Sequence, residues 1–301
     1  MSIYGIDLGT SNCLVARVVQ GRNQSIRIEC LDDNEGREEF PSIVSFRSDE
    51  EYIVGHEAAD KLIKEPDNTV ELIKVRLGNT KYIEFKIGTE KVKTPQQITS
   101  CVLKHFNKLH NDRIQDIVLT VPAYFKQPQR ESTIQAAELA GLNVKEKIAE
   151  PTAAIMYHLF YQYQQNGDTW LEEHTSKNIL VFDFGGGTLD LSLIEVKKDG
   201  QYIDPKVIQT EGDSELGGNN IDFVFTKVVL EVMEANYGDD PYITQLVEAY
   251  NDYYDNYINH HTLRFRKEVP IEMKESILQK IRRLSLDINE KILPGASFLE
   301  R

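Results

Sequence analysis

Two segments of the sequence share one pattern: Ile3-Tyr-Gly-Ile-Asp-Leu-Gly-Thr-Ser11 and Ile179-Leu-Val-Phe-Asp-Phe-Gly-Gly-Gly-Thr188. In each segment a short apolar run ends in an aspartate, Asp7 or Asp183, and a glycine turn with a hydroxyl residue follows at once. Short apolar runs bounded by turn residues are typical of β-strands. A repeat of this kind indicates a fold with two related halves.

The residues after each copy continue the repeat. The predicted second and third strands of the two copies are, in chain order, Leu14–Val19, Ile26–Cys30, Leu189–Val196 and Tyr202–Thr210. Turn residues separate these strands, Gly21-Arg22-Asn23 in the first copy and Asp199-Gly200 in the second.

After its third strand, the first copy continues through an inserted segment, residues 38–93, into alternating helices and strands. The predicted elements are a helix from Pro95 to about His110, a strand Asp116–Val121, a helix from Pro128 to Gly141, a strand Val144–Ile148 and a helix from Pro151. Proline in the first turn and glycine after the last turn are typical helix boundaries. In the second copy a helix is predicted from about Asn219 to Ala235. This alternation predicts an α/β fold.

The second copy is shorter than the first. We find no counterpart in it of the strand Asp116–Val121 or of the helix after that strand. In a mixed sheet these elements would lie beside Ile179–Asp183, so we expect that strand to be an open edge. Either the unit is truncated, or another chain or a rearrangement covers the edge. Because open apolar edges pair readily with other strands, we expect self-association through Ile179–Asp183.

The composition limits the class of protein and its partners. The 301 residues are 41% hydrophobic and carry a net charge of −14, which favours a globular chain with two lobes and disfavours nucleic acid as a partner. No apolar run approaches the roughly 20 residues of a membrane span, and the first residues do not resemble a secretion signal. We therefore expect a cytoplasmic protein without a membrane partner. Cys13, Cys30 and Cys101 are too few and too widely spaced for a disulfide framework or a zinc site.

Two glycine turns that face each other after strands would form a phosphate clamp. Glycine lets the backbone approach closely, so main-chain N–H groups can bind phosphate oxygens. The aspartate at each strand end would then hold a cation. A single glycine turn often serves only backbone geometry, whereas paired copies with the aspartate and the threonine in register favour the functional interpretation.

The residues of both turns also match a known family. Asp7-Leu-Gly-Thr-Ser-Asn12 and Asp183-Phe-Gly-Gly-Gly-Thr-Leu-Asp190 resemble the two phosphate loops of the seventy-kilodalton heat-shock chaperones of the DnaK type. Further signatures follow in the family's order: Val121-Pro-Ala-Tyr-Phe125 with Gln129-Arg130, Ala137-Glu-Leu-Ala-Gly-Leu142 with Ile148-Ala-Glu-Pro-Thr-Ala-Ala154, and Gly212-Asp-Ser-Glu-Leu-Gly-Gly218. The resemblance covers residues 1 to about 235. The insert around Gly78–Lys93 is more similar to the HscC branch than to DnaK itself.

This resemblance implies an actin-like ATPase fold, in which two ribonuclease H-like lobes surround a nucleotide cleft and the second lobe is incomplete. The implied divisions are a lobe I base at 1–37 and 94–176, a lobe I insert at 38–93, an incomplete lobe II base at 177–216 and a lobe II insert at 217–301. It further implies ATP or ADP with Mg²⁺ and K⁺ as cofactors. The implied partners are a J-domain co-chaperone and a nucleotide-exchange factor, and the implied role is nucleotide-driven control of protein folding.

The resemblance also implies roles for single residues. Asp7 and Asp183 would hold hydrated magnesium or potassium, and Thr188 and Asp190 would lie beside the γ-phosphate and a monovalent cation. The implied cofactor-binding residues are Gly9, Thr10, Ser11, Gly185, Gly186, Gly187, Gly217 and Gly218.

The implied catalytic residues are Lys74, Glu150, Asp183 and Thr188. Asn68-Thr-Val-Glu-Leu-Ile-Lys74 resembles the segment that carries the family's catalytic lysine, and a cation there would neutralise charge during phosphoryl transfer to water. Glu150 would help to position that water as an acceptor. Pro122 and Arg130 match a pair that relays nucleotide state between domains.

Each of these residues also has a purely structural interpretation. Lys74 could be a solvated charge, and Glu150 could be an acidic residue favoured by the dipole of the helix that it begins. Asp190 could simply be a strand residue, and Arg130 could pair with a nearby carboxylate. Cys13 lies next to a predicted phosphate loop, so it could be a site of thiol regulation or simply a buried, inert cysteine.

The sequence also departs from the family pattern. Asn219-Asn220 stands where the family usually has acidic residues. Asn289–Leu293 is the nearest match to the adenosine-binding helix, and Pro294-Gly295 directly after it breaks any helix. Neither Arg282 with Ser285 nor Glu290 completes the pattern, and no Gly-Gly-x-x-Arg-x-Pro segment follows.

Three interpretations therefore stay open. The chain is a chaperone ATPase domain, or a truncated or degenerate fragment that keeps the fold but lacks the adenosine pocket and does not hydrolyse ATP. The third is a kinase of the actin and sugar-kinase superfamily that transfers phosphate to a hydroxyl. The adjacent histidines His260-His261 suggest a metal site only weakly, because a histidine pair without carboxylate or cysteine partners is weak evidence for ligands.

Overall fold

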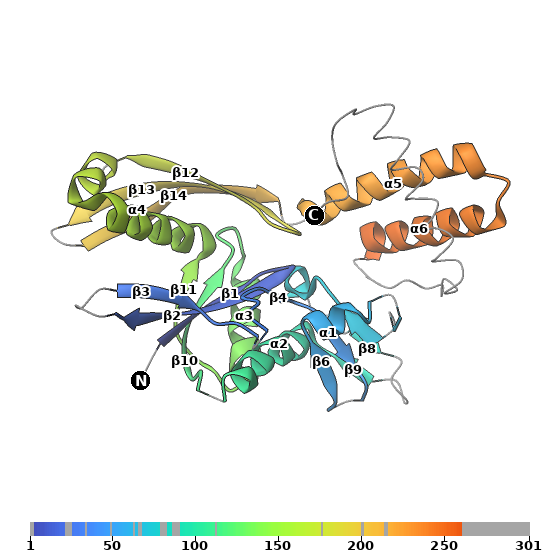
Figure 1. Cartoon of the computed structure of the whole chain (residues 1–301), viewed down its shortest axis with the longest axis horizontal. Coiled ribbons are helices and arrows are strands. Elements are labelled where there is room, and N and C mark those ends of the chain that lie inside the picture. The colour runs from blue at the N-terminus through green and yellow to red at the C-terminus, as the bar shows by residue number, and fades with distance from the viewer. Residues whose placement is uncertain are drawn as a thin grey trace. The chain divides into compact units, whose positions relative to one another are not determined.

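The first copy of the repeat forms a six-stranded mixed sheet, here called the large sheet, in the computed structural model of the chain (Figure 1). Its strands are β1 (Ile3–Leu8), β2 (Asn12–Gln20), β3 (Ile26–Cys30), β10 (Asp116–Val121) and β11 (Asn143–Ala149), in the order β11-β10-β1-β2-β3, with β4 (Phe40–Pro41) paired to β2. The pairs β1–β10 and β10–β11 are parallel, and β1–β2 and β2–β3 are antiparallel.

The structure describes residues 3–21, 26–33, 35–48, 50–62, 64–65, 68–78, 83–85, 91–111, 113–175, 177–199, 202–213 and 216–260.

Two helices provide the connections that parallel strands require. α2 (Pro95–Leu109) begins with a capping box between Thr94 and Gln97, and α3 (Gln127–Leu139) is followed by Gly141 at φ +79°. α2 buries Ile98, Val102 and Phe106, which are spaced by four residues and so share one helix face. Both helices have the boundaries expected from proline and glycine.

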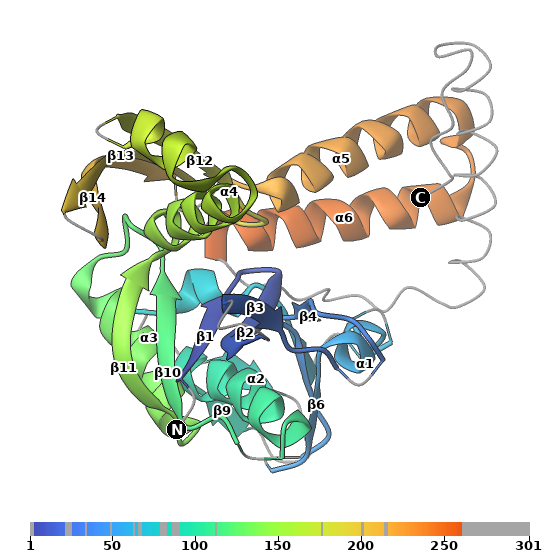
Figure 2. The same ribbon diagram turned by 60° about the vertical axis from the view of Figure 1, so that its left-hand side comes forward.

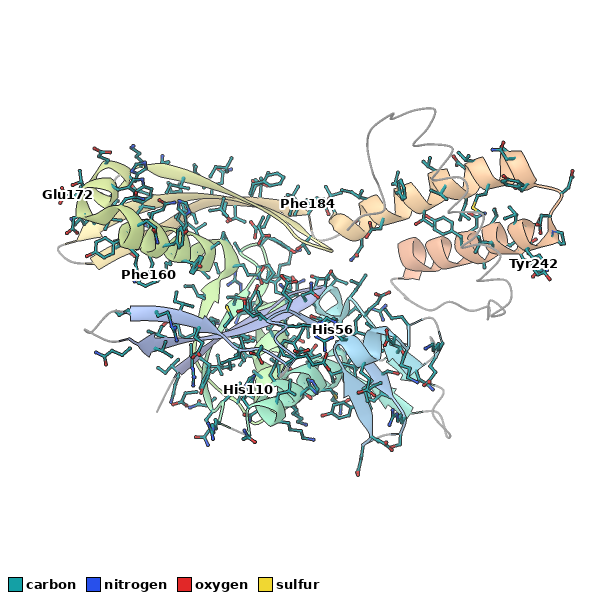
Figure 3. The ribbon with its side chains drawn as sticks, in the orientation of Figure 1. His56, His110, Phe160, Glu172, Phe184 and Tyr242 are labelled. Carbon is teal, nitrogen blue, oxygen red and sulfur yellow. The ribbon has the colours of Figure 1, made fainter. Side chains whose placement is uncertain are left out.

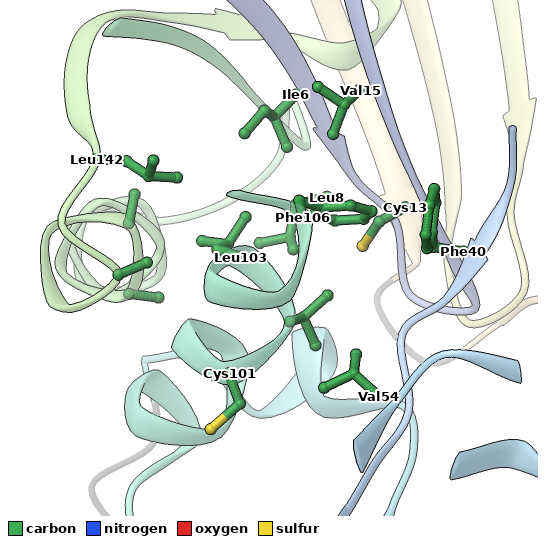
Figure 4. Packing of buried hydrophobic residues seen from close by; sticks show 14 of the residues in the cluster. Ile6, Leu8, Cys13, Val15, Phe40, Val54, Cys101, Leu103, Phe106 and Leu142 are labelled. Atoms are coloured by element: carbon green, nitrogen blue, oxygen red, sulfur yellow. The ribbon is translucent and has the colours of Figure 1, made fainter. Parts of the chain in front are cut away.

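The core of this part lies between the large sheet and α2, as Figure 4 shows for Leu103 and Phe106 beside Leu8. Phe106 also meets Phe40 edge to face, with ring centroids 4.6 Å apart. Because Phe40 opens the inserted segment, this contact fixes the start of the insert against the sheet that carries Asp7.

In the residues that the structure describes, the insert contributes a small antiparallel sheet, a separate pair of strands and two short helical turns. Its described elements are β5 (Val44–Phe46), β6 (Tyr52–Val54), α1 (His56–Ala59), β7 (Thr69–Val70), the 3₁₀ turn η3 (Ile73–Arg76), β8 (Ile83–Phe85) and β9 (Lys91–Lys93). The sheet order is β6-β5-β7, and β8 pairs separately with β9. η3 begins after Leu72, whose φ of +53° is left-handed, and this turn carries Lys74.

The second copy forms a three-stranded antiparallel sheet, the small sheet, from β12 (Asn178–Phe184), β13 (Leu189–Asp199) and β14 (Tyr202–Asp213). The long helix α4 (Glu150–His174), broken at Gly167, lies along this sheet in Figures 1 and 2. Its residues Ile155, Leu159 and Leu171 pack against Ile194 and Val196. All the strands predicted for the two copies are confirmed.

β12 is an edge strand of the small sheet among the described residues, as the sequence predicts. The side chains of Leu180 and Phe182 are each 64% exposed, and Phe184, labelled in Figure 3, is 39% exposed. They alternate with the half-buried Ile179 and Val181, which pack beside α4. The strand therefore presents an apolar face as well as a free edge.

The chain divides into two compact units, residues 1–221 and 222–301. The described part of the second unit contains most of α5 (Gly218–Tyr237) and all of α6 (Pro241–His260). Leu230 and Met233 pack there against Ile243 and Tyr250. The aromatic and amide-rich stretch Tyr250–Tyr257 is part of α6 and is helical. Arg282, Ser285, Asn289–Leu293 and His261 lie outside the described residues.

No helix in the described ranges is long and apolar enough to cross a membrane.

Candidate active site

The two glycine turns lie against each other within the first unit. We call Gly9–Ser11, after β1, the first loop and Gly185–Thr188, between β12 and β13, the second loop. A Cβ atom placed on Gly186 would lie 2.0 Å from Oγ of Ser11, and one placed on Gly187 would lie 2.9 Å from Cγ2 of Thr10. Side chains of the first loop thus fill the space beside the second loop.

Each loop is also tightly closed on itself. A Cβ atom on Gly9 would lie 1.9 Å from the carbonyl oxygen of Asn12, so any other residue there would force the turn open. In the second loop the N–H of Gly185 donates to the carbonyl of Thr188 at 2.9 Å. Both turns are therefore narrow, which suits a loop that binds phosphate through its backbone.

The segment before α5 closes against the second loop. The N–H groups of Gly218 and Asn219 donate to the carbonyls of Gly185 and Gly186 at 2.9 and 2.7 Å. Oδ1 of Asn220 accepts from the N–H of Gly217 at 2.8 Å. Asn219-Asn220, which departs from the family pattern, thus provides a main-chain contact and an amide cap instead of acidic side chains.

This contact predicts that alanine substitutions at two neighbouring glycines will differ sharply in their effect on stability. A Cβ atom on Gly217 would lie 2.5 Å from the nitrogen of Gly187, whereas one on Gly218 would have only ordinary contacts, 3.7 Å or more from Gly186 and Gly185. We expect Gly217→Ala to lower the free energy of unfolding by about 1–3 kcal/mol through overpacking, and Gly218→Ala to change it by less than about 0.5 kcal/mol. Urea unfolding measures both. Equal losses in the two variants would show that the second loop is not packed as described.

Lys74 and Glu150 form a buried ion pair. The Nζ atom of Lys74 lies 2.7 Å from Oε1 of Glu150, and the two side chains are 6% and 14% exposed. η3 of the insert carries the lysine, and the glutamate is the first residue of α4. Val75, next to Lys74, would lie 3.3 Å from a Cβ atom on Gly187, which places this segment beside the second loop.

The charges around this pair shift its titration. Burial raises the pKa of Glu150 to about 7 in spite of Lys74, and Asp7 and Asp183 raise it further. Burial alone would lower the pKa of Lys74, but the negative charges of Glu150 and Asp7 outweigh it and raise that pKa. Burial also raises the pKa of Asp183, with the charges of Asp190 and Asp7 adding to the effect and Lys74 opposing it. The site therefore has an excess of negative charge that an added cation would relieve.

Asp7 has a partner that sequence reasoning did not identify. Oγ1 of Thr120 donates to Oδ1 of Asp7 at 2.6 Å. Thr120 is the residue after Leu119 in β10, and Leu119 pairs with Ile6 in parallel register. Aligning the predicted strands Ile3–Asp7 and Asp116–Val121 in parallel would have pointed to this contact. The hydroxyl fixes one oxygen of Asp7.

Asp190 connects the small sheet to the turn after β10. It is 3% exposed; its Oδ2 accepts from the N–H of Ala123 at 3.1 Å, and its Oδ1 accepts from the hydroxyl of Ser192 at 2.9 Å. Both oxygens thus have protein donors. Asp190 is therefore more than a plain strand residue, because its carboxylate connects the two halves of the repeat.

Arg130 holds the same turn from the other side. Its guanidinium donates to the carbonyls of Phe125 and Ala123, each at 2.7 Å, and to that of Pro122 at 3.5 Å. The structural interpretation expected a carboxylate partner, whereas these contacts are with the main chain. The peptide group between Pro122 and Ala123 accepts from Arg130 and donates to Asp190.

The residues present suit a phosphate ligand with a hydrated cation. No group of three or more His, Cys, Asp or Glu side chains in the described part of the chain is placed to hold a metal directly. Mg²⁺ commonly keeps several waters and is bound by only one or two carboxylates together with phosphates, so Asp7 and Asp183 are suitable ligands. The two narrow loops and Lys74 complete a set that can bind an anion.

Comparisons with known proteins point to one family. A family model described as Hsp70 protein matches residues 3–247. The chain is 36% identical over 242 residues to a protein named "Chaperone protein DnaK" from Thermoplasma volcanium, covering 79% of this chain and 37% of that protein. A protein of the same name from Endomicrobium trichonymphae is 34% identical over 242 residues, with 79% and 36% covered. The chain thus spans little more than a third of the length of these curated relatives.

Proposed function

The chain belongs to the Hsp70 family, and from this membership we propose that it binds ATP between its two glycine loops and hydrolyses it slowly to ADP and phosphate. The observation that carries this proposal is the buried Lys74–Glu150 pair beside the second loop. A buried ion pair costs desolvation energy and is weak support for stability alone. Its place next to two loops suited to phosphate favours a catalytic use.

In this proposal the residues divide into binding and reacting groups. Main-chain N–H groups of the two loops bind phosphate oxygens, and Gly217-Gly218 closes the second loop. Lys74 neutralises charge that develops on the transferred phosphoryl group. Glu150, whose burial raises its pKa to about 7, accepts a proton from the attacking water near neutral pH.

Cations complete the proposed site. Asp7 and Asp183 would hold hydrated Mg²⁺, and K⁺ would be the second cation, beside Thr188 and Asp190. A bound divalent ion supplies charge neutralisation on the phosphates. Thr120 keeps Asp7 in one orientation through its 2.6 Å hydrogen bond, and the tie to Ala123 positions Asp190.

The family also suggests a wider role. Curated relatives are named chaperone proteins, and we propose that nucleotide state in this chain controls protein folding through the Pro122–Arg130 turn. A J-domain co-chaperone, a nucleotide-exchange factor, a role in the stress response and a cytoplasmic location are parts of the same proposal. So are the lobe divisions at 1–37 with 94–176, 38–93, 177–216 and 217–301.

One assay separates the three interpretations. We expect phosphate to be released slowly from MgATP at excess protein, at a rate unchanged by added sugars or other hydroxyl compounds. Loss of ATP only in the presence of a hydroxyl acceptor would favour the kinase interpretation. If the chain neither releases phosphate nor binds ATP, the result would favour a fragment that keeps the fold without nucleotide affinity.

The open edge of the small sheet gives a separate prediction. We propose that β12 pairs with other copies, because its edge lacks a partner in the described structure and Leu180 and Phe182 are exposed beside it. Sedimentation velocity should show association that increases with concentration. Leu180→Lys should shift the chain toward monomer. Val18→Lys is the matched control, because Val18 is 65% exposed but lies in β2, which has neighbours on both sides. A wild-type chain that stays monomeric at high concentration would contradict this prediction.

A further inference from the structure

We propose that Ser42, which lies outside the motifs that resemble the family's loops, is a positioning residue that holds the first loop in its phosphate-binding shape. The inference rests on the proposed function of that loop. Ser42 is 1% exposed and directly follows β4, which pairs with Asn12 and Cys13 of β2. Its place in the chain therefore sets it beside the loop Gly9–Ser11.

Three contacts join Ser42 to the loop and the residues after it. The N–H of Ser42 donates to the carbonyl of Ser11 at 2.7 Å, and its hydroxyl donates to the carbonyl of Gly9 at 2.9 Å. Sγ of Cys13 lies 2.9 Å from the same hydroxyl oxygen. One buried residue thus binds two of the three carbonyls of the first loop.

The direction of these hydrogen bonds follows from chemistry. The carbonyl of Gly9 can only accept, so the single hydroxyl proton of Ser42 is used there. The thiol of Cys13 must then be the donor to the hydroxyl oxygen. Burial raises the pKa of Cys13 to about 12, which keeps that thiol protonated. The result is a chain of donors from Cys13 through Ser42 to the loop, with Cys13 as an inert support.

This arrangement has a consequence for the opposite side of the loop. In a planar trans peptide the N–H points away from the C=O of the same peptide group. Fixing the carbonyls of Gly9 and Ser11 toward Ser42 therefore fixes the N–H groups of Thr10 and Asn12 in the opposite direction. Backbone donors that are oriented in advance bind an anion without paying for reorganisation.

Ser45 provides a matched control three residues away. It is also 1% exposed, and its hydroxyl oxygen lies 2.9 Å from Oγ1 of Thr69, within the sheet of the insert. Removing either hydroxyl should destabilise the fold: Ser42→Ala loses the contacts with Gly9 and Cys13, and Ser45→Ala loses the contact with Thr69. Of these two serines, Ser42 hydrogen-bonds to carbonyls of the first loop, whereas the Ser45 hydroxyl contacts Thr69 in the insert.

The test compares Ser42→Ala with Ser45→Ala in the full chain. We expect Ser42→Ala to weaken binding of MgADP and MgATP alike, by about tenfold, and to speed hydrogen exchange at the amide of Thr10. Ser45→Ala should lower the melting temperature but leave both readouts unchanged. Ser42→Cys, which keeps the side-chain size with a weaker donor, is used if Ser42→Ala does not fold, and should lie between wild type and Ser42→Ala.

Two results would overturn the role of Ser42: equal nucleotide affinity in the two alanine variants, or unchanged exchange at Thr10 in Ser42→Ala. The exchange measurement needs no nucleotide. If wild type fails to bind MgADP and MgATP, the proposed function fails, and exchange at Thr10 still decides whether Ser42 positions the loop.

Discussion

Replacing Lys74 with alanine is expected to abolish ATP turnover while leaving MgATP binding largely intact. The ammonium group lies 2.7 Å from Glu150, where it can neutralise charge that grows during transfer of the phosphoryl group to water. Removal of one such stabilising group typically lowers kcat by about 10²–10³-fold. In the proposed site the main-chain groups of the two loops contribute most of the binding, and the substitution does not remove them. Single-turnover phosphate release and calorimetric binding measure the two effects separately.

The substitution also needs a stability control. Breaking a buried ion pair costs about 3–5 kcal/mol, since Glu150 would be left without its cation. Lys74→Met keeps the apolar stem and serves as a second variant. Lys61→Ala is the matched control, because Lys61 forms a 2.6 Å ion pair with Glu65 in the insert, at 27% and 40% exposure. Turnover that survives in Lys74→Met would remove the lysine from the mechanism.

The second large effect is expected at Glu150. As a proton acceptor this carboxyl must be ionised, so kcat should fall as the pH drops through about 7, the value to which burial raises its pKa. Glu150→Gln cannot accept the proton; we expect it to lose about 10²–10⁴-fold in kcat together with this pH dependence. A pH–rate profile between about pH 5 and 9 tests both points.

The free energy of unfolding should change with pH in the direction opposite to kcat: the contribution of Glu150 to it falls as the pH rises. Because the folded pKa of Glu150 is raised from 4.5 to about 7, its contribution to stability is fully present below 4.5 and is lost as the pH rises through about 7. Glu146→Gln, at an exposed position in β11, is the control for both measurements. A wild-type rate that stays flat across this range would exclude Glu150 as the acceptor.

Local sequence patterns predicted the elements well, because strands and helices depend on short-range spacing. Apolar runs ending at Asp7 and Asp183 gave two strands, and Pro95 and Gly141 marked helix boundaries that the structure confirms. The open edge at β12 also followed from the sequence, since the repeat showed which strand lacked a counterpart.

Contacts between distant segments were harder to predict. The pairing of Lys74 with Glu150 joins residues 76 positions apart, and no local pattern encodes it. The contacts of Ser42 with the first loop depend on how β4 returns to β2, which is a tertiary feature. Asp190 was considered as a cation ligand or a strand residue, and its bond to Ala123 across the two halves was not expected. The family resemblance predicted which residues act at the site, and the structure adds how several of them are held.

The most direct test of the central proposal is calorimetric titration of the 301-residue chain with MgATP. We predict binding with a Kd in the micromolar range or tighter, which corresponds to a binding free energy of about −8 kcal/mol or more negative. Such binding would mean that the two loops and their cations work together with an adenosine site in this chain. No detectable binding at millimolar nucleotide would contradict the proposal and leave a chain with the Hsp70 fold that does not hold ATP.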